Sequence, residues 1–528
     1  MTDWYSKAIF YELYPRAFAD GNGDGWGDFI GLRQRLDYLQ WLGVDCIWMT
    51  PVYPSPLRDD GYDVSSYYGI DPKYGLMEDF KLTVDEIHRR GMRIVMDLVM
   101  NHTSDLHPWF VEARRSKDSP LRDYYVWTHD PEKYNEARII FLDTEKSNWA
   151  YDEMSGEYYW HRFYSSQPDL NYDNPKVHDE MLGILDFWLE FGIDGFRVDA
   201  VPYLYEREGT NCENLPETHD FIRKMRQFVD EKYPGTLLLA EANQWPKDLL
   251  PYFGDNDEFN VSFNFPVMPR LYMALAKGDR SDVVEILNET PPIPEGCQWA
   301  TFLRNHDELT LEMVTEEQRQ FMWDYYAPES RQRLNLGIRR RLAPLMNNDR
   351  RKIELMHSLL LTLPGAPVLY YGDEIGMGDN TGLEDRNGVR TPMQWNDSSN
   401  GGFSTAPIEN LYAPPVSGPD YGYGAVNVLV QEITPNSLLH MVRHMLYTRK
   451  DLDMLPSGSL TWLDQLPNEL LCFWRDGKFL ALHNLVEEDR LVELPHGFKF
   501  VDALDEEQAV EPTIILPPYG FRWLLVTE

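Results

Sequence analysis

Cysteine, long apolar runs and positive charge are all scarce in this sequence, and each shortage excludes a class of protein. Four cysteines occur in 528 residues, widely spaced and in no metal-binding pattern, which favours buried thiols in a reducing compartment over a disulfide framework. No run of about 18 apolar residues is present, so we expect no membrane-spanning helix. The N-terminus has no basic segment followed by an apolar one, so we expect no signal peptide and a cytoplasmic location.

The shortage of positive charge limits the partners of the chain. Lys and Arg number 49 against 86 Asp and Glu, a formal net charge of -37. Such a chain repels nucleic-acid phosphates and anionic membrane surfaces, so we expect neither as a partner. Hydrophobic residues make up 43% and aromatic residues 13% of the sequence, which is enough to build a large core and excludes a disordered protein.

Short apolar runs alternate with helical segments, as in parallel strands covered by helices. Helices are expected, for example, over Leu76–Arg90 and Val177–Phe191. The eight expected strands lie within Ala8–Pro15, Val44–Pro51, Arg93–His102, Gly195–Val201, Leu237–Ala242, Phe259–Phe265, Gln298–Asp307 and Pro367–Glu374. This alternation predicts an α/β fold, a (β/α)8 TIM barrel.

Two segments interrupt or follow the barrel pattern. Residues 103–171, rich in Tyr, Trp and His, are too many for a loop and predict an inserted subdomain B after the third strand. The barrel would then comprise residues 1–102 and 172–450. Residues 451–528 predict a C-terminal antiparallel β domain. Its strand-like runs are Glu469–Trp474, Phe479–Leu485 and Thr513–Leu516.

Three acidic residues directly follow apolar runs, where a TIM barrel places its chemistry. They are Asp199, Glu241 and Asp307. Any one of them could be a helix cap or an ion-pair partner. Together at one barrel mouth they indicate a shared site, because a retaining glycosidase needs a nucleophile and a general acid/base, and a third acid can stabilise the transition state. Arg197 faces the same way as Asp199 and would keep it ionised.

Four segments resemble, in order, the four signature regions of the α-amylase superfamily (glycoside hydrolase family 13): DLVMNH, GFRVDAV, LLLAEAN and FLRNHDE. QPDLN at Gln167–Asn171 resembles an additional signature of its oligo-1,6-glucosidase-like members. The resemblance implies Asp199 as nucleophile, Glu241 as general acid/base and Asp307 as transition-state stabiliser. The substrate-binding residues implied in the same way are Asp59, Tyr62, His102, Gln167, Arg197, His306 and Arg390.

Several of these residues have a second interpretation or a specific expected partner. Tyr62 can stack on a sugar face or pack in the core, and His306 can be a structural histidine. In relatives that act on chain ends, an acid three residues before that tyrosine pairs with a late arginine. Asp59 and Arg390 match those positions. Such a pair closes the pocket floor and leaves room for one terminal glucose.

Two calcium sites are expected, and no organic cofactor. The Asp20–Asp28 loop alternates oxygen ligands with glycines but is not an EF-hand, and a polar turn is the alternative. The resemblance implies, at this loop, the ligands Asp20, Asn22, Asp24, Asp28 and the Trp26 carbonyl. It implies, at a second site that would pin the subdomain to the barrel, Asn101, Asp169, Glu206 and the carbonyls of Tyr203 and Leu204.

Three further segments narrow the expected reaction. Ser55–Asp63, Arg304–Met313 and Gly372–Asn380 resemble trehalose synthases more than oligo-1,6-glucosidases or sucrose isomerases. This implies an isomerase that interconverts the disaccharides maltose and trehalose within one pocket, with some hydrolysis to glucose. The nearest alternative is an α-glucosidase or oligo-1,6-glucosidase, and less favoured are a sucrose-converting transferase and a non-catalytic, transporter-associated relative. A homo-oligomer remains open.

Overall fold

Eight parallel strands close into a barrel in the computed structural model, which describes residues 4–505 and 509–527. Neighbouring strands around the barrel are β1 (Phe10–Leu13), β14 (Ala366–Tyr370), β10 (Gln298–Phe302), β9 (Val261–Phe263), β8 (Leu237–Ala240), β7 (Gly195–Asp199), β3 (Arg93–Val99) and β2 (Cys46–Met49). Seven of the expected runs contain their strand, and β14 begins one residue before the eighth run. The predicted TIM barrel is confirmed.

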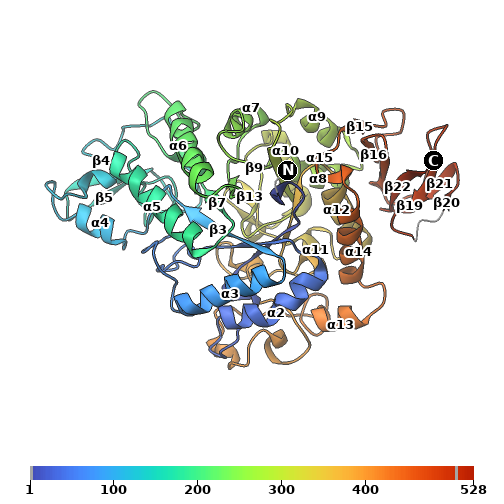
Figure 1. Cartoon of the computed structure of the whole chain (residues 1–528), viewed down its shortest axis with the longest axis horizontal. Helices are drawn as coiled ribbons and strands as arrows, with labels where there is room; N and C mark the ends of the chain where they lie inside the picture. The colour runs from blue at the N-terminus through green and yellow to red at the C-terminus, as the bar shows by residue number, and fades with distance from the viewer. Residues whose placement is uncertain (1–3, 506–508, 528) are drawn as a thin grey trace.

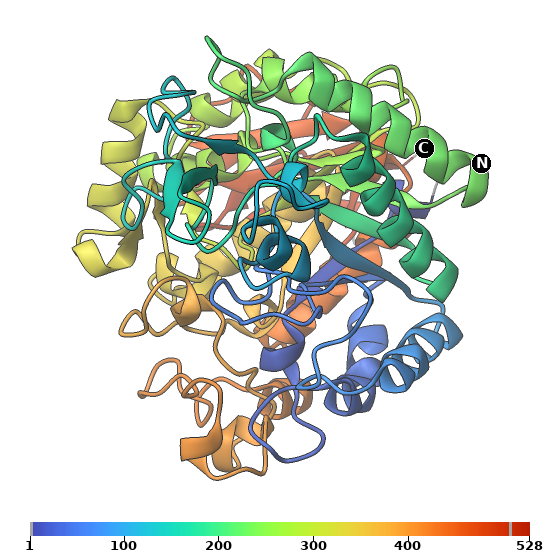
Figure 2. The same cartoon turned by 90° about the vertical axis from the view of Figure 1, so that its left-hand side faces the viewer.

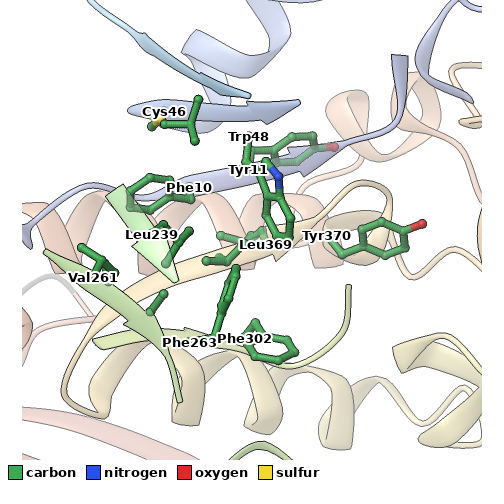
Figure 3. Packing of buried hydrophobic residues seen from close by; sticks show 14 of the residues in the cluster. Phe10, Tyr11, Cys46, Trp48, Leu239, Val261, Phe263, Phe302, Leu369 and Tyr370 are labelled. Carbon is green, nitrogen blue, oxygen red and sulfur yellow. The ribbon is translucent and has the colours of Figure 1, made fainter. Parts of the chain in front are cut away.

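The barrel strands are mostly apolar because both of their faces are largely buried. Every residue of β1, β2 and β8 is buried. Trp48 and Phe263 belong to strands that are not neighbours, yet their ring centroids lie 5.3 Å apart, so these side chains meet across the barrel interior. Phe302 packs on Phe263 at 5.4 Å, as Figure 3 shows. The interior is therefore a packed core, and the site lies at its open end.

Helices surround the barrel and are bounded by ordinary start and stop signals. The longer ones are α2 (Phe29–Leu42), α3 (Met77–Arg89), α5 (Pro175–Phe191), α6 (Pro216–Lys232), α8 (Val267–Lys277), α9 (Ser281–Glu289), α10 (Glu316–Tyr326), α12 (Arg350–Thr362) and α14 (Leu438–Asp451). Asp28 caps α2 by accepting from the Gly31 amide at 2.7 Å. Gly43 and Gly192 end α2 and α5 in the left-handed conformation, which glycine adopts at little cost. Both helices predicted by range are confirmed.

The predicted insertion contains a small antiparallel sheet of its own. Strands β4 (Trp127–Thr128), β6 (Glu157–Trp160) and β5 (Trp149–Asp152) pair in that order, with α4 (Pro108–Ala113) before them. Trp149 and Trp160 pack edge to face at 4.9 Å. The sheet lies at one end of the molecule in Figure 1 and in front of the barrel in Figure 2. A bridge between His102 and Asp169 joins the insertion to the end of β3.

A C-terminal antiparallel β domain follows the barrel, as predicted, at the opposite end from the insertion (Figure 1). One sheet has the order β15 (Leu460–Trp462), β16 (Leu470–Arg475), β17 (Phe479–Asn484), β22 (Phe521–Thr527), β19 (Lys499–Asp502) and β20 (Ala509–Val510). A second pairs β18 (Arg490–Glu493) with β21 (Thr513–Leu516). The buried Trp523 indole donates to Ser358 of α12 at 2.8 Å, which attaches this domain to the barrel. The residue bounds of the domains remain predictions.

Among residues 4–505 and 509–527, none of the helices combines the length and the apolar character that a membrane crossing requires.

Candidate active site

The three acidic residues come together at one end of the barrel. Asp199 is the last residue of β7, Glu241 directly follows β8, and Asp307 lies in the loop after β10. All three line one cavity, as the position of each at a strand end predicts. The cavity is lined by Asp59, Tyr62, His102, Ile140, Phe141, Phe163, Asp199, Ala200, Tyr203, Glu241, Asn243, Phe265, Asn305, His306, Asp307, Glu308, Thr310, Glu312 and Arg386.

One buried arginine holds two of these carboxylates side by side. Nη1 of Arg197 contacts Oδ1 of Asp199 at 2.5 Å, and Nη2 contacts Oε1 of Glu241. The same guanidinium also pairs with Asp97 inside the barrel. The Ala200 amide donates to Oε2 of Glu241 at 3.1 Å, and Ala200 adopts a left-handed φ of 51° to do so. A single guanidinium that joins both side chains holds the two carboxyl groups close together at the cavity.

The two carboxyl groups have different proton affinities. Burial raises the pKa of Asp199 to about 6, against the opposing effect of Arg197. Burial also raises the pKa of Glu241, to about 7. Arg197 opposes this shift, whereas the nearby charges of Asp199 and Asp307 add to it. Near neutral pH Asp199 is mostly ionised and Glu241 is about half protonated. One nucleophile and one proton donor is the division of labour that glycoside cleavage requires.

Asp307 is surrounded by cations and stays ionised. Its Oδ1 lies 3.0 Å from Nη1 of Arg386 and 3.0 Å from Nη2 of Arg390, and its Oδ2 lies 3.2 Å from Nε2 of His306. Burial acts to raise the pKa of Asp307, but His306 and Arg386 outweigh burial and hold it well below its usual range. A fixed negative charge at this position can bind sugar hydroxyls and stabilise a developing positive charge.

The predicted pairing of Asp59 with Arg390 is wrong. Asp59 pairs with Arg386 at 3.0 Å and accepts from Nε2 of Gln167 at 2.8 Å, whereas Arg390 pairs with Asp60. Asp60, the next residue, adopts a left-handed φ of 53° and pairs with Arg390. Arg386 lines the cavity and Arg390 does not. An ion pair that includes Asp59 still lines the cavity, but with a different arginine.

The remaining predicted sugar-binding residues divide into two groups. Tyr62 and His306 both line the cavity, with their rings stacked at 5.2 Å and 9°. His102 also lines it, and burial lowers the pKa of His102 to about 4, so the ring is neutral. Gln167 and Arg197 do not line the cavity. They orient Asp59 and the two central acids, so the structure gives them supporting positions.

Known proteins resemble this chain in both sequence and fold. The family profile described as alpha amylase, catalytic domain, matches residues 12–327 and 338–458. The chain belongs to the α-amylase family. It is 52% identical over 543 residues to the trehalose synthase/amylase TreS of Mycobacterium tuberculosis (99% of this chain, 90% of the relative) and 53% identical over 555 residues to a trehalose synthase of Pimelobacter sp. (100% and 96%). The solved trehalulose synthase of Pseudomonas mesoacidophila is similar in fold, with a TM-score of 0.81, 28% identity and 99% of each chain covered.

Sequence reasoning missed an ion-pair bridge between the insertion and a cavity-lining residue of the barrel. Arg138 of the insertion contacts Glu312, which lies beyond β10, at 3.0 Å and Glu213 at 2.8 Å. Asn243 donates to Glu312 at 3.1 Å, and Arg138 donates to the Tyr203 hydroxyl at 3.2 Å. These contacts tie the insertion to the barrel through Glu312, Asn243 and Tyr203, which line the cavity. Glu312 lies within a segment that carried the trehalose synthase resemblance, but no sequence pattern marks Arg138.

The aromatic wall of the cavity was also missed. Phe141 and Phe163 of the insertion pack at 5.5 Å, and Phe163 packs edge to face on Tyr203 at 5.7 Å. All three line the cavity. Amphipathic rings of this kind suit the apolar C–H face of a sugar. The Tyr- and Trp-rich composition of the insertion was the available signal, although it could not distinguish a cavity wall from a subdomain core.

The second predicted calcium site contains buried oxygens that lack partners. Oδ1 of Asn101, Oδ2 of Asp169 and Oε1 of Glu206 are buried and make no hydrogen bond within the described part of the chain. Buried polar atoms are normally satisfied, so three such oxygens fit a hard cation such as Ca²⁺. No three His, Cys, Asp or Glu side chains in residues 4–505 and 509–527 gather as a metal site. An ion here would therefore also need the asparagine and the predicted carbonyls of Tyr203 and Leu204.

The first predicted calcium loop is held by its own amides. Oδ1 of Asp20 accepts from the Gly23 amide at 2.6 Å, and Oδ2 of Asp28 accepts from the Asn22 amide at 3.1 Å. Oδ1 of Asn22 accepts in turn from the Asp24 amide at 2.9 Å. These contacts are those of a polar turn, the alternative interpretation, and none of these side-chain oxygens is among the buried unpartnered atoms of the described chain. The calcium assignment at this loop, with the Trp26 carbonyl, stays a prediction.

Proposed function

We propose that this protein interconverts maltose and trehalose by transferring a glucosyl group within one closed pocket. The observation that carries the proposal is the pair Asp199 and Glu241, joined by Arg197 in a cavity that the ion pair of Asp59 and Arg386 also lines. Relatives named trehalose synthases, at 52% and 53% identity over nearly the whole chain, support the choice of this reaction over others on the same fold.

The first half-reaction uses the two central acids in opposite roles. The terminal glucose of maltose binds above the Asp59–Arg386 pair, with its ring against Tyr62 and His306. Glu241 donates its proton to the glycosidic oxygen while Asp199 attacks the anomeric carbon from the other side. The bond to the second glucose breaks, and a β-glucosyl-enzyme forms on Asp199. Asp307 stabilises the positive charge that develops on the sugar ring.

The second half-reaction depends on keeping the freed glucose in place. Arg138 pairs with the cavity-lining Glu312, and Phe141, Phe163 and Tyr203 also line the cavity. The retained glucose turns and presents its own C1 hydroxyl, from which Glu241 now takes the proton. That hydroxyl attacks the glucosyl-enzyme, Asp199 leaves, and an α,α-1,1 bond forms with net retention. Confinement gives the acceptor a high effective concentration relative to water, so hydrolysis to glucose is a side reaction.

Product analysis tests this proposal. The purified protein is incubated with maltose and ¹³C-labelled free glucose, and the products are followed by NMR. We expect unlabelled trehalose to form first, with a minor amount of glucose. Glucose as the only product would instead identify an α-glucosidase. Trehalose that is labelled from the outset would identify a transferase that exchanges its acceptor with solution. Asp199→Asn should lose both activities together, and survival of either would overturn the assignment of the nucleophile.

The unpartnered oxygens of Asn101, Asp169 and Glu206 support a structural calcium ion in the same proposal. The ion would neutralise these buried acids and hold the insertion, and with it Arg138, on the barrel. It would take no part in glucosyl transfer. The cytoplasmic location stays a prediction from the sequence, as does the possibility of a homo-oligomer.

Removal of calcium should lower thermal stability more than activity at moderate temperature. We expect a chelator to lower the melting temperature by about 5 °C or more, because a ligand bound only to the native state stabilises it. Asp169→Asn should abolish the response to added Ca²⁺, whereas Asp20→Asn tests the first loop separately. Metal analysis of the purified protein gives the stoichiometry. Immediate and complete loss of activity with an intact fold would contradict a structural role.

A further inference from the structure

A buried glutamate of β1 faces the active site from within the barrel. Glu12 is 0% exposed. Its Oε1 accepts from the His306 amide at 3.1 Å and lies 2.5 Å from Nδ1 of the His306 ring. Its Oε2 has no hydrogen-bond partner in the described residues. A buried carboxylate is costly unless it is paired, so this position requires a cation beside Glu12.

The His306 ring lies between two carboxylates. Nδ1 faces Glu12, and Nε2 lies 3.2 Å from Oδ2 of Asp307. An ionised carboxylate only accepts hydrogen bonds, and a neutral imidazole carries a single N–H. A neutral ring would therefore point one lone pair at a carboxylate oxygen. Only the doubly protonated ring donates to both, so the contacts define His306 as an imidazolium cation.

The wider surroundings of His306 agree with a charged ring. Burial lowers the pKa of His306, but Asp307 and Glu12 outweigh burial and raise it to about 10. His306 in turn lowers the pKa of Asp97 and of Glu241, so both of these acids also face it. Rings and one further cation complete the shell: Tyr62 stacked, Trp48 and Tyr14 edge-on, and Arg390 donating to the His306 carbonyl.

We propose that Glu12 is a positioning residue for glucosyl transfer: it keeps His306 doubly protonated and holds its ring so that Nε2–H points at Asp307. Glu12 does not line the cavity and acts through His306, which does. The inference rests on the proposed function for its kinetic readout only. It adds a residue from the first barrel strand, which lies outside every sequence motif discussed above.

The consequence concerns the charge balance at Asp307. Three cations contact this carboxylate, and two of them are arginines that are charged at any pH. The third is His306, whose charge depends on its neighbours. Without the charge of Glu12 the ring should lose its second proton within the working pH range. The cavity would then lose an N–H donor, and a lone pair would oppose Asp307.

Glu12→Gln tests the proposal because it removes the charge and keeps the size of the side chain. The main readout is the NMR signal of the His306 ring in protein with ¹⁵N-labelled histidine, assigned by comparison with His306→Asn. In the native protein we expect a doubly protonated ring up to at least pH 9. In Glu12→Gln we expect the ring to titrate at least about three pH units lower, near pH 7 or below, so that it is largely neutral at pH 8; each unit is a tenfold change in proton affinity.

The kinetic readout is the ratio of variant to native kcat/KM at each pH. For Glu12→Gln we expect a loss of about tenfold or more at pH 8, recovering severalfold at pH 6 as the ring regains its proton. The ratio cancels only the titrations that both proteins share, and a neutral His306 no longer lowers the pKa of Glu241, so the ring signal and not the rate is the main readout. Glu12→Asp keeps the charge and should retain more of the activity at pH 8 than Glu12→Gln.

Glu374 supplies a matched control. It is also 0% exposed, and its Oε1 accepts from the Tyr11 and Tyr38 hydroxyls while its Oε2 has no partner in the described residues. Glu374→Gln should leave both the ring signal and the pH dependence of the ratio unchanged. The proposal fails if Glu12→Gln leaves the ring doubly protonated at pH 8, or if Glu374→Gln alters it equally. The ring signal needs no turnover, so the proposal is tested even if the protein makes no trehalose.

Discussion

At the scale of the residue, the site is a set of charges whose protonation states are decided by burial and by neighbours. Arg197 touches both central acids, yet burial raises the pKa of both, and neighbouring acids add to this: Asp97 at Asp199, and Asp199 and Asp307 at Glu241. Asp307 has the opposite balance, since cations surround it. The same three residue types, moved to a solvated surface, would all titrate near pH 4 and could not divide the work of acid and nucleophile.

The pH dependence of the reaction follows from this division. Asp199 must be ionised, so kcat/KM for maltose should fall as the pH drops below its pKa of about 6. Glu241 must be protonated for the first step, so kcat/KM should also fall as the pH rises above its pKa of about 7. We expect a narrow bell between these values, measured by initial rates in buffers of constant ionic strength. A flat profile from pH 5 to 9 would be inconsistent with the pair.

At the scale of the element, the insertion and the loop after β10 together line one part of the cavity. Residues of the insertion supply Arg138, Phe141 and Phe163, and the loop supplies Glu312. The loop is itself held by backbone pairing, since Leu309 and Thr310 form a short antiparallel ladder with Gly337 and Ile338. The sheet β4–β6–β5 provides a folded base from which Arg138 reaches across to the barrel. In the proposed mechanism, the elements that would retain the second glucose are thus separate from those that would cleave the bond.

Opening this bridge should shift the product from trehalose towards glucose. In Arg138→Ala we expect the ratio of glucose to trehalose formed from maltose to rise by about three- to tenfold, because the retained acceptor loses its advantage over water. Both products are quantified by chromatography at low conversion. Arg331→Ala is the matched control, since Arg331 pairs at the surface with Glu329 and is 61% exposed. An unchanged ratio in Arg138→Ala would remove the bridge from the mechanism.

At the scale of the whole molecule, the C-terminal domain is fastened to the barrel through α12. Trp523 is fully buried, packs on Phe479 at 5.9 Å and donates to Ser358. Arg475 donates to the Thr362 carbonyl at 2.7 Å, close to the end of the same helix. No cavity-lining residue comes from this domain within the described chain. We therefore expect this domain to contribute to the stability of the barrel.

Loss of the Trp523 side chain should test that contribution. Trp523→Ala should lower the free energy of unfolding by about 3–5 kcal/mol, as expected for a large aromatic removed from a core, while kcat at low temperature stays close to native. Leu491→Ala, at a residue that is 62% exposed in the same domain, should change it by less than about 0.5 kcal/mol. Urea unfolding followed by circular dichroism measures both. Equal effects in the two variants would refute the fastening role.

The sequence by itself determined the barrel, the insertion, the C-terminal sheet and the three acids, because strand periodicity, apolar runs and the residues that follow them are local properties. Only the tertiary structure decided which charges meet. Asp59 pairs with Arg386 and not with Arg390 because of the backbone turn at Asp60, and Arg138 meets Glu312 from a separate subdomain. Glu12 gives no signal in sequence, since a glutamate within a strand reveals its role only when the barrel closes and brings His306, 294 positions away, against it. Contacts between distant residues depend on how loops and strands pack together, which no local pattern encodes.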